Sequence, residues 1–227
     1  MIGIVGAMQV EIDYIKARLT SVEEQTLLGR VFYQAVYDGV DVVVVQSGIG
    51  KANAAATTAI LIDHFAPTHI INTGVAGGIE RAQGDLVIAD AVTYYDIYAD
   101  AFGYEPGQVP GEPRLFYSDV PMTNQLLALH PKAFHGVIAS GDRFVTERKT
   151  VEWMSETIQA VDMESAAIGQ ICAQAEIPFA IVRAISDQVQ SEQQTQDFDT
   201  FVLEAADIAA NLITKWIHQH VTTTRSL

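Results

Sequence analysis

The 227-residue sequence predicts an α/β fold: one domain with a twisted, mixed β-sheet flanked by helices. Short apolar runs typical of buried strands alternate with segments of helical character. Two β-rich runs joined by Asp38-Gly39, a strong hairpin signal, add an antiparallel part to the sheet. With 49% hydrophobic residues the chain can build one full core, which favours a single domain over residues 1–227.

The first half of the chain alternates between strand and helix signals. We expect strands at 2–5, 31–37, 40–46 and 69–72, and helices at about 9–19 and 51–64. A tight turn, Ser47-Gly48-Ile49-Gly50, separates the hairpin from the Ala-rich second helix. A glycine loop at 73–78 follows the strand at 69–72.

The second half continues in the same way but contains one long irregular segment. We expect strands at 85–94, 134–140 and 179–185, and helices at 124–130, 146–156, 163–175 and 200–220. Residues 96–117 hold six glycines and prolines together with Phe102, Tyr104 and Phe116, which indicates a loop. An aromatic loop of this length usually covers a site or contacts a partner subunit.

Composition excludes several classes of partner. Lys and Arg number 13 and Asp and Glu 28, so the formal net charge is −15, and nucleic acid or an anionic membrane is not expected to bind. The lone cysteine, Cys172, fits a reducing compartment. No signal peptide or apolar run of about 20 residues is recognisable, so a cytoplasmic protein is the expectation.

Two common cofactor motifs are absent. Residues 45–52 resemble a phosphate loop, but Val45 replaces its first glycine and Ala52 the hydroxyl residue that would hold magnesium. The glycines near the N-terminus do not complete a dinucleotide fingerprint. The six histidines, including His218 and His220 on one helix, form no zinc pattern, so no metal site is expected.

Three acids, Glu11, Glu164 and Asp187, follow apolar runs, at the joins where open α/β sheets bind ligands. Each also has a structural interpretation. Glu11 and Glu164 lie near helix starts, which favour negative charge, and Asp162 is a candidate N-cap. Asp187 shares a predicted strand face with Arg183, so an ion pair between them is the alternative to a functional role, although about 13 Å of ideal strand separates their Cα atoms.

Considered together, the motifs carry a resemblance that covers nearly the whole chain. Six segments occur in this order: Gly3-Ile4-Val5-Gly6-Ala7-Met8 with Glu11, Ser47-Gly48-Ile49-Gly50-Lys51, Asn72-Thr73-Gly74-Val75-Ala76-Gly77-Gly78, Ser140-Gly141-Asp142-Arg143-Phe144, Asp162-Met163-Glu164, and Arg183-Ala184-Ile185-Ser186-Asp187. The chain resembles the 5'-methylthioadenosine/S-adenosylhomocysteine nucleosidases of the nucleoside phosphorylase superfamily. The resemblance implies a nucleoside phosphorylase-like fold, a homodimer, and no metal or organic cofactor.

The resemblance also implies a reaction. It is hydrolysis of the N-glycosidic bond of 5'-methylthioadenosine and S-adenosylhomocysteine, with 5'-deoxyadenosine as a further expected substrate, to adenine and the 5-thioribose product. Matching motif positions assign water activation to Glu11 and protonation of adenine N7 to Asp187. Met163 and Glu164 would hold the ribose. Acid and base on opposite sides of the bond would follow the logic of glycoside hydrolases.

The remaining matched positions form the expected substrate-binding set. Phe144 would stack on adenine and the main chain of Val145 would bond its edge. Met8, Ile49 and Phe198 would line the thioalkyl end, and Phe102 and Pro110 of the 96–117 loop would complete that pocket across the dimer interface. Val75, Gly77 and Arg183 belong to the same set.

Two positions depart from the family pattern, and three other functions compete with the one that the resemblance implies. Val75 stands where the family commonly has Ser, and Asp162 where Glu is usual. A phosphorylase would need an arginine before the glycine loop, but that residue is Asn72, and Glu11 would repel phosphate. A second competing function is that of a futalosine-type hydrolase of the same superfamily. A third is silent nucleoside binding, against which the intact acids argue.

Overall fold

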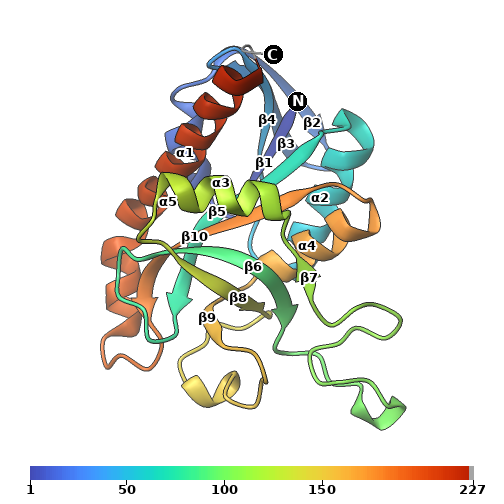
Figure 1. The fold of residues 1–227 in the computed structure, drawn as a ribbon, viewed down its shortest axis with the longest axis vertical. Helices are drawn as coiled ribbons and strands as arrows, with labels where there is room; N and C mark the ends of the chain where they lie inside the picture. Colours follow the sequence, from blue (N-terminus) through green and yellow to red (C-terminus); the bar gives the residue numbers. More distant parts are fainter. Residues whose placement is uncertain (225–227) are drawn as a thin grey trace.

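Ten strands of one sheet form the centre of the computed structural model, which describes residues 1–224 (Figure 1). The strands are β1 (Ile2–Gly6), β2 (Thr20–Leu27), β3 (Arg30–Tyr37), β4 (Val40–Gln46), β5 (His69–Gly78), β6 (Leu86–Tyr94), β7 (Phe116–Tyr117), β8 (Phe134–Ser140), β9 (Ile158–Asp162) and β10 (Phe179–Gln188). The helices are α1 (Gln9–Lys16), α2 (Lys51–Phe65), α3 (Val120–Leu129), α4 (Ser165–Gln174) and α5 (Gln194–Thr224), with 3-10 turns at Asp100–Phe102 and Arg148–Thr150.

The sheet is mixed and curls on itself. Its order is β10-β6-β8-β9-β5-β1-β4-β3-β2, with β7 beside β6. Because β10 also pairs with β5, the strands β5, β9, β8, β6 and β10 close into a ring, and β1 to β4 extend from it. Strands β4, β1, β5 and β10 are mutually parallel, so their carboxyl ends lie at one edge. The predicted mixed α/β fold is confirmed.

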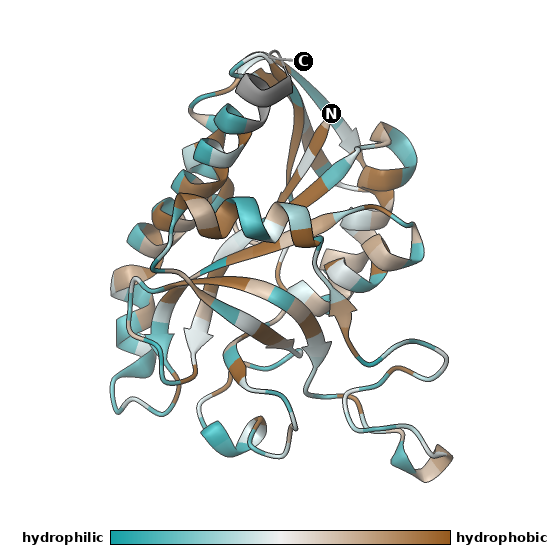
Figure 2. Ribbon diagram, in the orientation of Figure 1, coloured by the Kyte–Doolittle hydropathy of each residue, from teal (hydrophilic) through white to brown (hydrophobic). Residues whose placement is uncertain are grey.

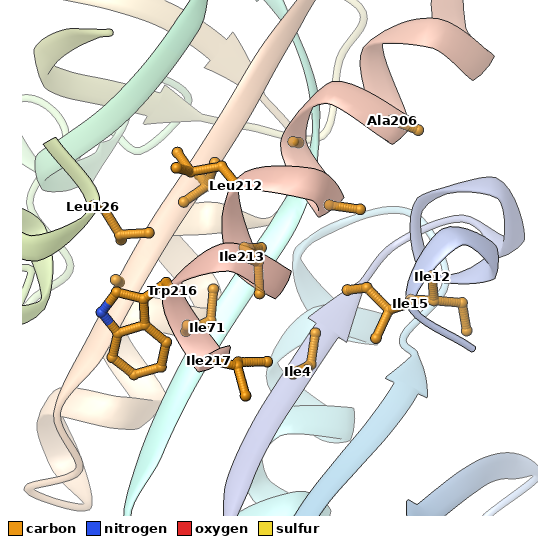
Figure 3. Packing of buried hydrophobic residues seen from close by; sticks show 14 of the residues in the cluster. Ile4, Ile12, Ile15, Ile71, Leu126, Ala206, Leu212, Ile213, Trp216 and Ile217 are labelled. Carbon is orange, nitrogen blue, oxygen red and sulfur yellow. The ribbon is translucent and has the colours of Figure 1, made fainter. Parts of the chain in front are cut away.

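Helices cover both faces of this sheet. Helices α1, α3 and α5 lie on one side and α2 and α4 on the other (Figure 1). Hydrophobic residues concentrate on the strands and on the helix faces turned toward them (Figure 2). On the α5 side, Ile213 and Trp216 pack with Ile4 and Ile71 of the sheet, and the Trp216 indole N–H donates to Gln125 on α3 at 2.8 Å (Figure 3). The sheet is therefore held rigidly between two apolar layers.

Several predicted elements need correction. The helix expected at 146–156 is wrong: this segment forms one 3-10 turn, with Val151 and Met154 buried against Tyr95 and Ile158. The three-residue spacing of these two apolar residues is typical of a helix, but here a loop buries both of them. The glycine loop at 73–78 is the second half of β5, and the helix predicted from 124 begins at Val120.

Strands β2 and β9 and the two-residue β7 were not expected. Strand β2 pairs with β3 at the edge of the sheet and is largely exposed, so its polar residues show no hydrophobic alternation. Strand β9 is only five residues long and leads directly into the motif at 162–164. Within residues 1–224, no helix has the length and apolar character of a membrane span.

Candidate active site

A cavity of about 270 Å³ opens where the carboxyl ends of β1, β5 and β10 meet the ends of β8 and β9. It brings together ten of the residues expected from the sequence: Met8, Glu11, Ile49, Val75, Gly77, Phe144, Met163, Glu164, Asp187 and Phe198. A smaller recess of about 40 Å³ continues from it and is lined by Val145 and Gln194 as well as Asp187. The distant segments thus form one polar-floored pocket.

Three predicted residues lie elsewhere. Arg183 is 1% exposed and lies behind the cavity wall. Phe102 is 82% exposed, and Pro110 is also exposed, on the long loop that projects from the lower right of the molecule in Figure 1. Within this single chain neither contributes to the cavity lining.

Glu11 is fixed by main-chain donors. It lies in the first turn of α1, and its carboxylate accepts N–H bonds from Ala7 at 2.6 Å, Met8 at 2.9 Å and Val75 at 3.0 Å. A Cβ atom on Gly74 would lie 2.5 Å from Glu11 Oε1, so only glycine leaves room for the carboxylate. Burial raises the pKa of Glu11 above its ordinary value, while the charge of Arg183 and the backbone donors oppose this. A raised pKa makes the carboxylate a stronger base.

Glu164 precedes α4 and accepts the Gly50 N–H at 2.8 Å, which ties the 47–50 turn to the opposite wall. Burial, reinforced by the negative charge of Asp162, raises the pKa of Glu164 to about 7. The charge of Arg183 and the Gly50 N–H only partly offset these effects. The side chain therefore titrates near neutral pH.

Asp187 lies near the end of β10, beyond a bulge. The pairing with β5 shifts between Ile185 and Asp187, so Ser186 is an extra residue and the predicted common face for 183, 185 and 187 is interrupted. Its carboxylate accepts from the Ser186 hydroxyl at 2.6 Å and the Gln194 amide at 2.8 Å. Burial raises the pKa of Asp187, and the charge of Asp197 adds to this, while both hydrogen bonds oppose it.

The Arg183–Asp187 ion pair considered from the sequence is wrong. Arg183 Nε donates to Asp162 Oδ2 at 2.8 Å, and Arg183 also donates to Asn72 at 2.5 Å. Asp162 Oδ1 accepts the N–H groups of Glu164 and Ser165 at 3.2 Å, but the N-cap residue of α4 is Glu164, so the interpretation of Asp162 as the N-cap is wrong. The buried pair joins Arg183, behind the cavity wall, to Asp162, which lines the cavity.

The sequence interpretation did not assign a site role to Ser140, Asp162 or Gln194. Ser140 Oγ donates to Asp162 at 2.5 Å and orients it. Asp162 belongs to the motif Asp162-Met163-Glu164, which the resemblance already contained. A site role for Asp162 could therefore have been predicted from the sequence. No local pattern marks Gln194, because it reaches the pocket only through the packing of the first turn of α5.

The opposite end of the cavity is apolar. Met8, Ile49 and Phe198 line it, and the rings of Phe144 and Phe198 meet edge to face with centroids 6.0 Å apart. Ile49 and Phe144 are 52% and 43% exposed, so this end opens to solvent. Over residues 1–224, no cluster of His, Cys, Asp and Glu has the arrangement of a metal site.

Comparison with known proteins identifies the family to which the chain belongs. The family model described as the phosphorylase superfamily matches residues 1–218. The chain is 41% identical over 221 residues to a 5'-methylthioadenosine/S-adenosylhomocysteine nucleosidase of Geobacillus kaustophilus, covering 93% of this chain and 94% of that protein.

Solved structures agree in fold as well as in sequence. An S-adenosylhomocysteine nucleosidase of Streptococcus pyogenes, in complex with 5-methylthiotubericidin, matches with a TM-score of 0.91 and 34% identity over 96% of both chains. A nucleosidase for the same two substrates from Colwellia psychrerythraea, in complex with adenine, matches with a TM-score of 0.90 and 36% identity over 96% of this chain and 94% of that one. The chain therefore belongs to the phosphorylase superfamily and, within it, to the family of 5'-methylthioadenosine/S-adenosylhomocysteine nucleosidases.

Proposed function

We propose that the protein hydrolyses the N-glycosidic bond of 5'-methylthioadenosine and S-adenosylhomocysteine, releasing adenine and the 5-thioribose product. The observation that carries this proposal is the meeting of Glu11, Glu164 and Asp187 in one cavity, with the pKa of each carboxyl raised. Such a set can supply a proton to one side of a bond and remove one on the other. The names of the relatives support these two substrates.

Asp187 acts as the acid in this scheme. Adenine is a poor leaving group as an anion, and protonation at N7 lets it depart as a neutral base. A carboxyl with a raised pKa retains its proton to higher pH, which suits donation near neutrality. Val145 lies in the same recess, where its main chain can bond the purine edge, and Phe144 supplies an aromatic face for stacking.

Glu11 acts as the base that activates water. Its two oxygens are oriented by three N–H donors, so the carboxylate does not have to be ordered when substrate binds. The same buried acid disfavours phosphate as the nucleophile. Asn72, which stands where a phosphorylase would need an arginine, is already used by Arg183 at 2.5 Å.

Glu164 and Met163 hold the ribose. An anionic Glu164 accepts hydrogen bonds from the sugar hydroxyls and stabilises the positive charge that develops on the sugar as the bond breaks. The open apolar end at Met8, Ile49 and Phe198 suits a thioether substituent that is short in one substrate and long in the other. The same opening supports 5'-deoxyadenosine as a third substrate.

We further propose a homodimer in which the 96–117 loop completes the neighbouring site. Phe102, at 82% exposure, is a large apolar side chain without cover in the single chain, and a partner pocket would bury it. We expect Phe102→Ala to raise KM for methylthioadenosine and to weaken association of the subunits in sedimentation. A variant that is unchanged in both measurements would exclude Phe102 from a shared site. Cys172, buried as a free thiol, suits the proposed cytoplasmic location.

One assay tests the reaction. The protein is incubated with methylthioadenosine with and without phosphate, and adenine is followed by chromatography. We expect phosphate-independent release, lost in Asp187→Asn and Glu11→Gln while an analogue still binds. Phosphate dependence would instead indicate a phosphorylase, and release only from a futalosine-type nucleoside another hydrolase. Binding without any release would indicate a silent binder.

A further inference from the structure

The carboxamide of Gln194 lies in the recess assigned to the purine edge. Its side chain is 5% exposed, although its neighbours at 192, 193, 195 and 196 are exposed. Gln194 Nε2 donates to the Val145 carbonyl at 2.8 Å and to Asp187 Oδ2 at 2.8 Å. The first residue of α5 is thus bonded to the acid and to the main-chain acceptor that substrate would use.

This donor pattern matches one part of adenine. Adenine carries an exocyclic amine with two hydrogens, next to N7, which is an acceptor. The Gln194 amide is likewise one nitrogen with two hydrogens, and it satisfies two acceptors at once. A 6-oxo purine would place an acceptor against the same two oxygens. A purine amine that donates to both of these oxygens needs the position that Gln194 Nε2 already fills, so the two nitrogens exclude each other.

We propose that Gln194 is a positioning residue that fills the place of the purine amine in the free enzyme and leaves when substrate binds. This inference rests on the proposed function. Gln194 keeps the acceptors of Val145 and Asp187 satisfied in the absence of substrate, because buried unpaired acceptors are costly. Substrate that carries a 6-amino group replaces both bonds, whereas a 6-oxo purine displaces the amide without replacing them.

Gln194 also affects the proton on Asp187 in the free enzyme. There its amide stabilises the carboxylate form of Asp187, so removing the amide favours the protonated form, whereas in the complex the purine amine takes over the same bond. The charged and titratable groups that share the cavity or recess with Asp187, or act on its charge, are Asp197 on α5, Glu11 on α1, Arg143 after β8, Asp162 at the end of β9 and Glu164 before α4. Replacing Gln194 by an uncharged residue leaves all of these in place.

Departure needs little rearrangement. Gln194 is the first residue of α5, and the turn at 189–193 that precedes it lies at the surface except where Val189 and Ser191 are half-buried. The amide oxygen is held only by the Gln190 N–H at 3.2 Å among the bonds described for it. Rotation of the Gln194 side chain toward solvent therefore breaks the three hydrogen bonds to Gln190, Val145 and Asp187.

The test compares Gln194→Met, which keeps the length but removes the donors, with Gln196→Met, the same change at an exposed position of the same helix. Adenine binding is measured by calorimetry, and kcat and kcat/KM for methylthioadenosine are measured against pH. We expect Gln194→Met to bind adenine roughly 3- to 10-fold more tightly, since no amide has to be displaced. The alkaline limb of kcat/KM should move to higher pH and that of kcat should not, because the two report free and substrate-bound enzyme.

Other results would overturn the inference. Weaker adenine binding, or a lower kcat at every pH, would mean that Gln194 stays beside the substrate or is merely structural. If Gln194→Met fails to fold, Gln194→Ala is judged by the same two readouts. A wild-type protein that binds adenine but releases none from methylthioadenosine would contradict the proposed function instead. In that case adenine affinity in the variants still decides the role of Gln194.

Discussion

Arg183 and Asp162 form a buried ion pair at 2.8 Å, with both side chains at most 2% exposed. Asp162 lines the same cavity as Glu11, Glu164 and Asp187, and the pair is reinforced by Asn72 and Ser140. Removing one partner leaves an uncompensated charge in the interior, which typically costs about 3–5 kcal/mol. We therefore expect Asp162→Ala to lower the free energy of unfolding by that amount in urea titrations.

Glu80→Ala is the matched control for this prediction. It breaks another Arg–carboxylate pair, Arg148–Glu80, whose side chains are 43% and 66% exposed. Surface pairs contribute about 0–1 kcal/mol, so this variant should unfold near the wild-type midpoint. Similar losses of unfolding free energy in both variants would show that burial does not determine how much the Arg183–Asp162 pair contributes to stability.

Gly74→Ala should impair catalysis more than folding. The added Cβ would lie 2.5 Å from Glu11 Oε1 and 2.9 Å from an Arg183 nitrogen, so the Glu11 carboxylate must move. A displacement of about 1 Å at a reacting group can cost about 10²-fold in rate. We expect a loss of that order in kcat for methylthioadenosine, measured by adenine release.

Gly29→Ala separates this effect from general backbone strain. Gly29 has a φ of +76° in the turn between β2 and β3, and a Cβ there meets nothing within 4 Å. Alanine is strained at this angle, so the variant should lose stability. Its kcat should nevertheless equal that of the wild type. An active Gly74→Ala protein would mean that Glu11 need not keep its observed position.

Glu164→Gln should stabilise the protein at alkaline pH. The ordinary pKa of 4.5 is raised to about 7 in the folded state, mainly by burial. The folded state therefore holds this proton more tightly than the unfolded chain, so stability falls as pH rises from 4.5 through 7, and below 4.5 the cost is absent. Glutamine removes the cost, so we expect a gain of roughly 1–3 kcal/mol at pH 8 and little change at pH 4.5.

Thermal or urea unfolding at the two pH values measures this difference. Asp13→Asn, at an exposed position on α1, serves as the control and should shift the unfolding free energy by less than about 0.5 kcal/mol at both. A Glu164→Gln protein that is no more stable than the wild type at pH 8 would show that the buried charge of Glu164 does not destabilise the folded state.

The order of the main elements was predictable because the central strands β1, β5, β6 and β10 are largely buried and form apolar runs. Strand β10 is an example, since nine of its ten residues are buried. Strand β2 was not predictable, because an exposed edge strand needs no apolar pattern and is held by its pairing with β3. The helix prediction at 146–156 failed for the opposite reason, because an apolar pattern is present without the helix. Val151 and Met154 are spaced as on a helix, but they are buried in a loop.

For the site, ordered motifs identified the residues that line the cavity, but not the contacts between them. The partner of Arg183 depends on the bulge at Ser186 and on the curl of the sheet that brings β9 to β5, neither of which has a local signal. Gln194 depends on where α5 begins relative to the pocket. A contribution of Phe102 to the site requires the proposed second subunit, so it stays a prediction.

Val75→Ser tests the departure from the family pattern at the floor of the pocket. Val75 is 8% exposed, lines the cavity, and donates its N–H to Glu11 at 3.0 Å, so a serine hydroxyl there would lie beside the base. One added hydrogen bond corresponds to roughly 2- to 10-fold in kcat/KM. Since the change also removes methyl groups from the core, Val75→Ala is the control. We expect the serine variant to exceed the alanine variant in kcat/KM for methylthioadenosine, and equal rates and selectivity in both would show that the missing hydroxyl has no role here.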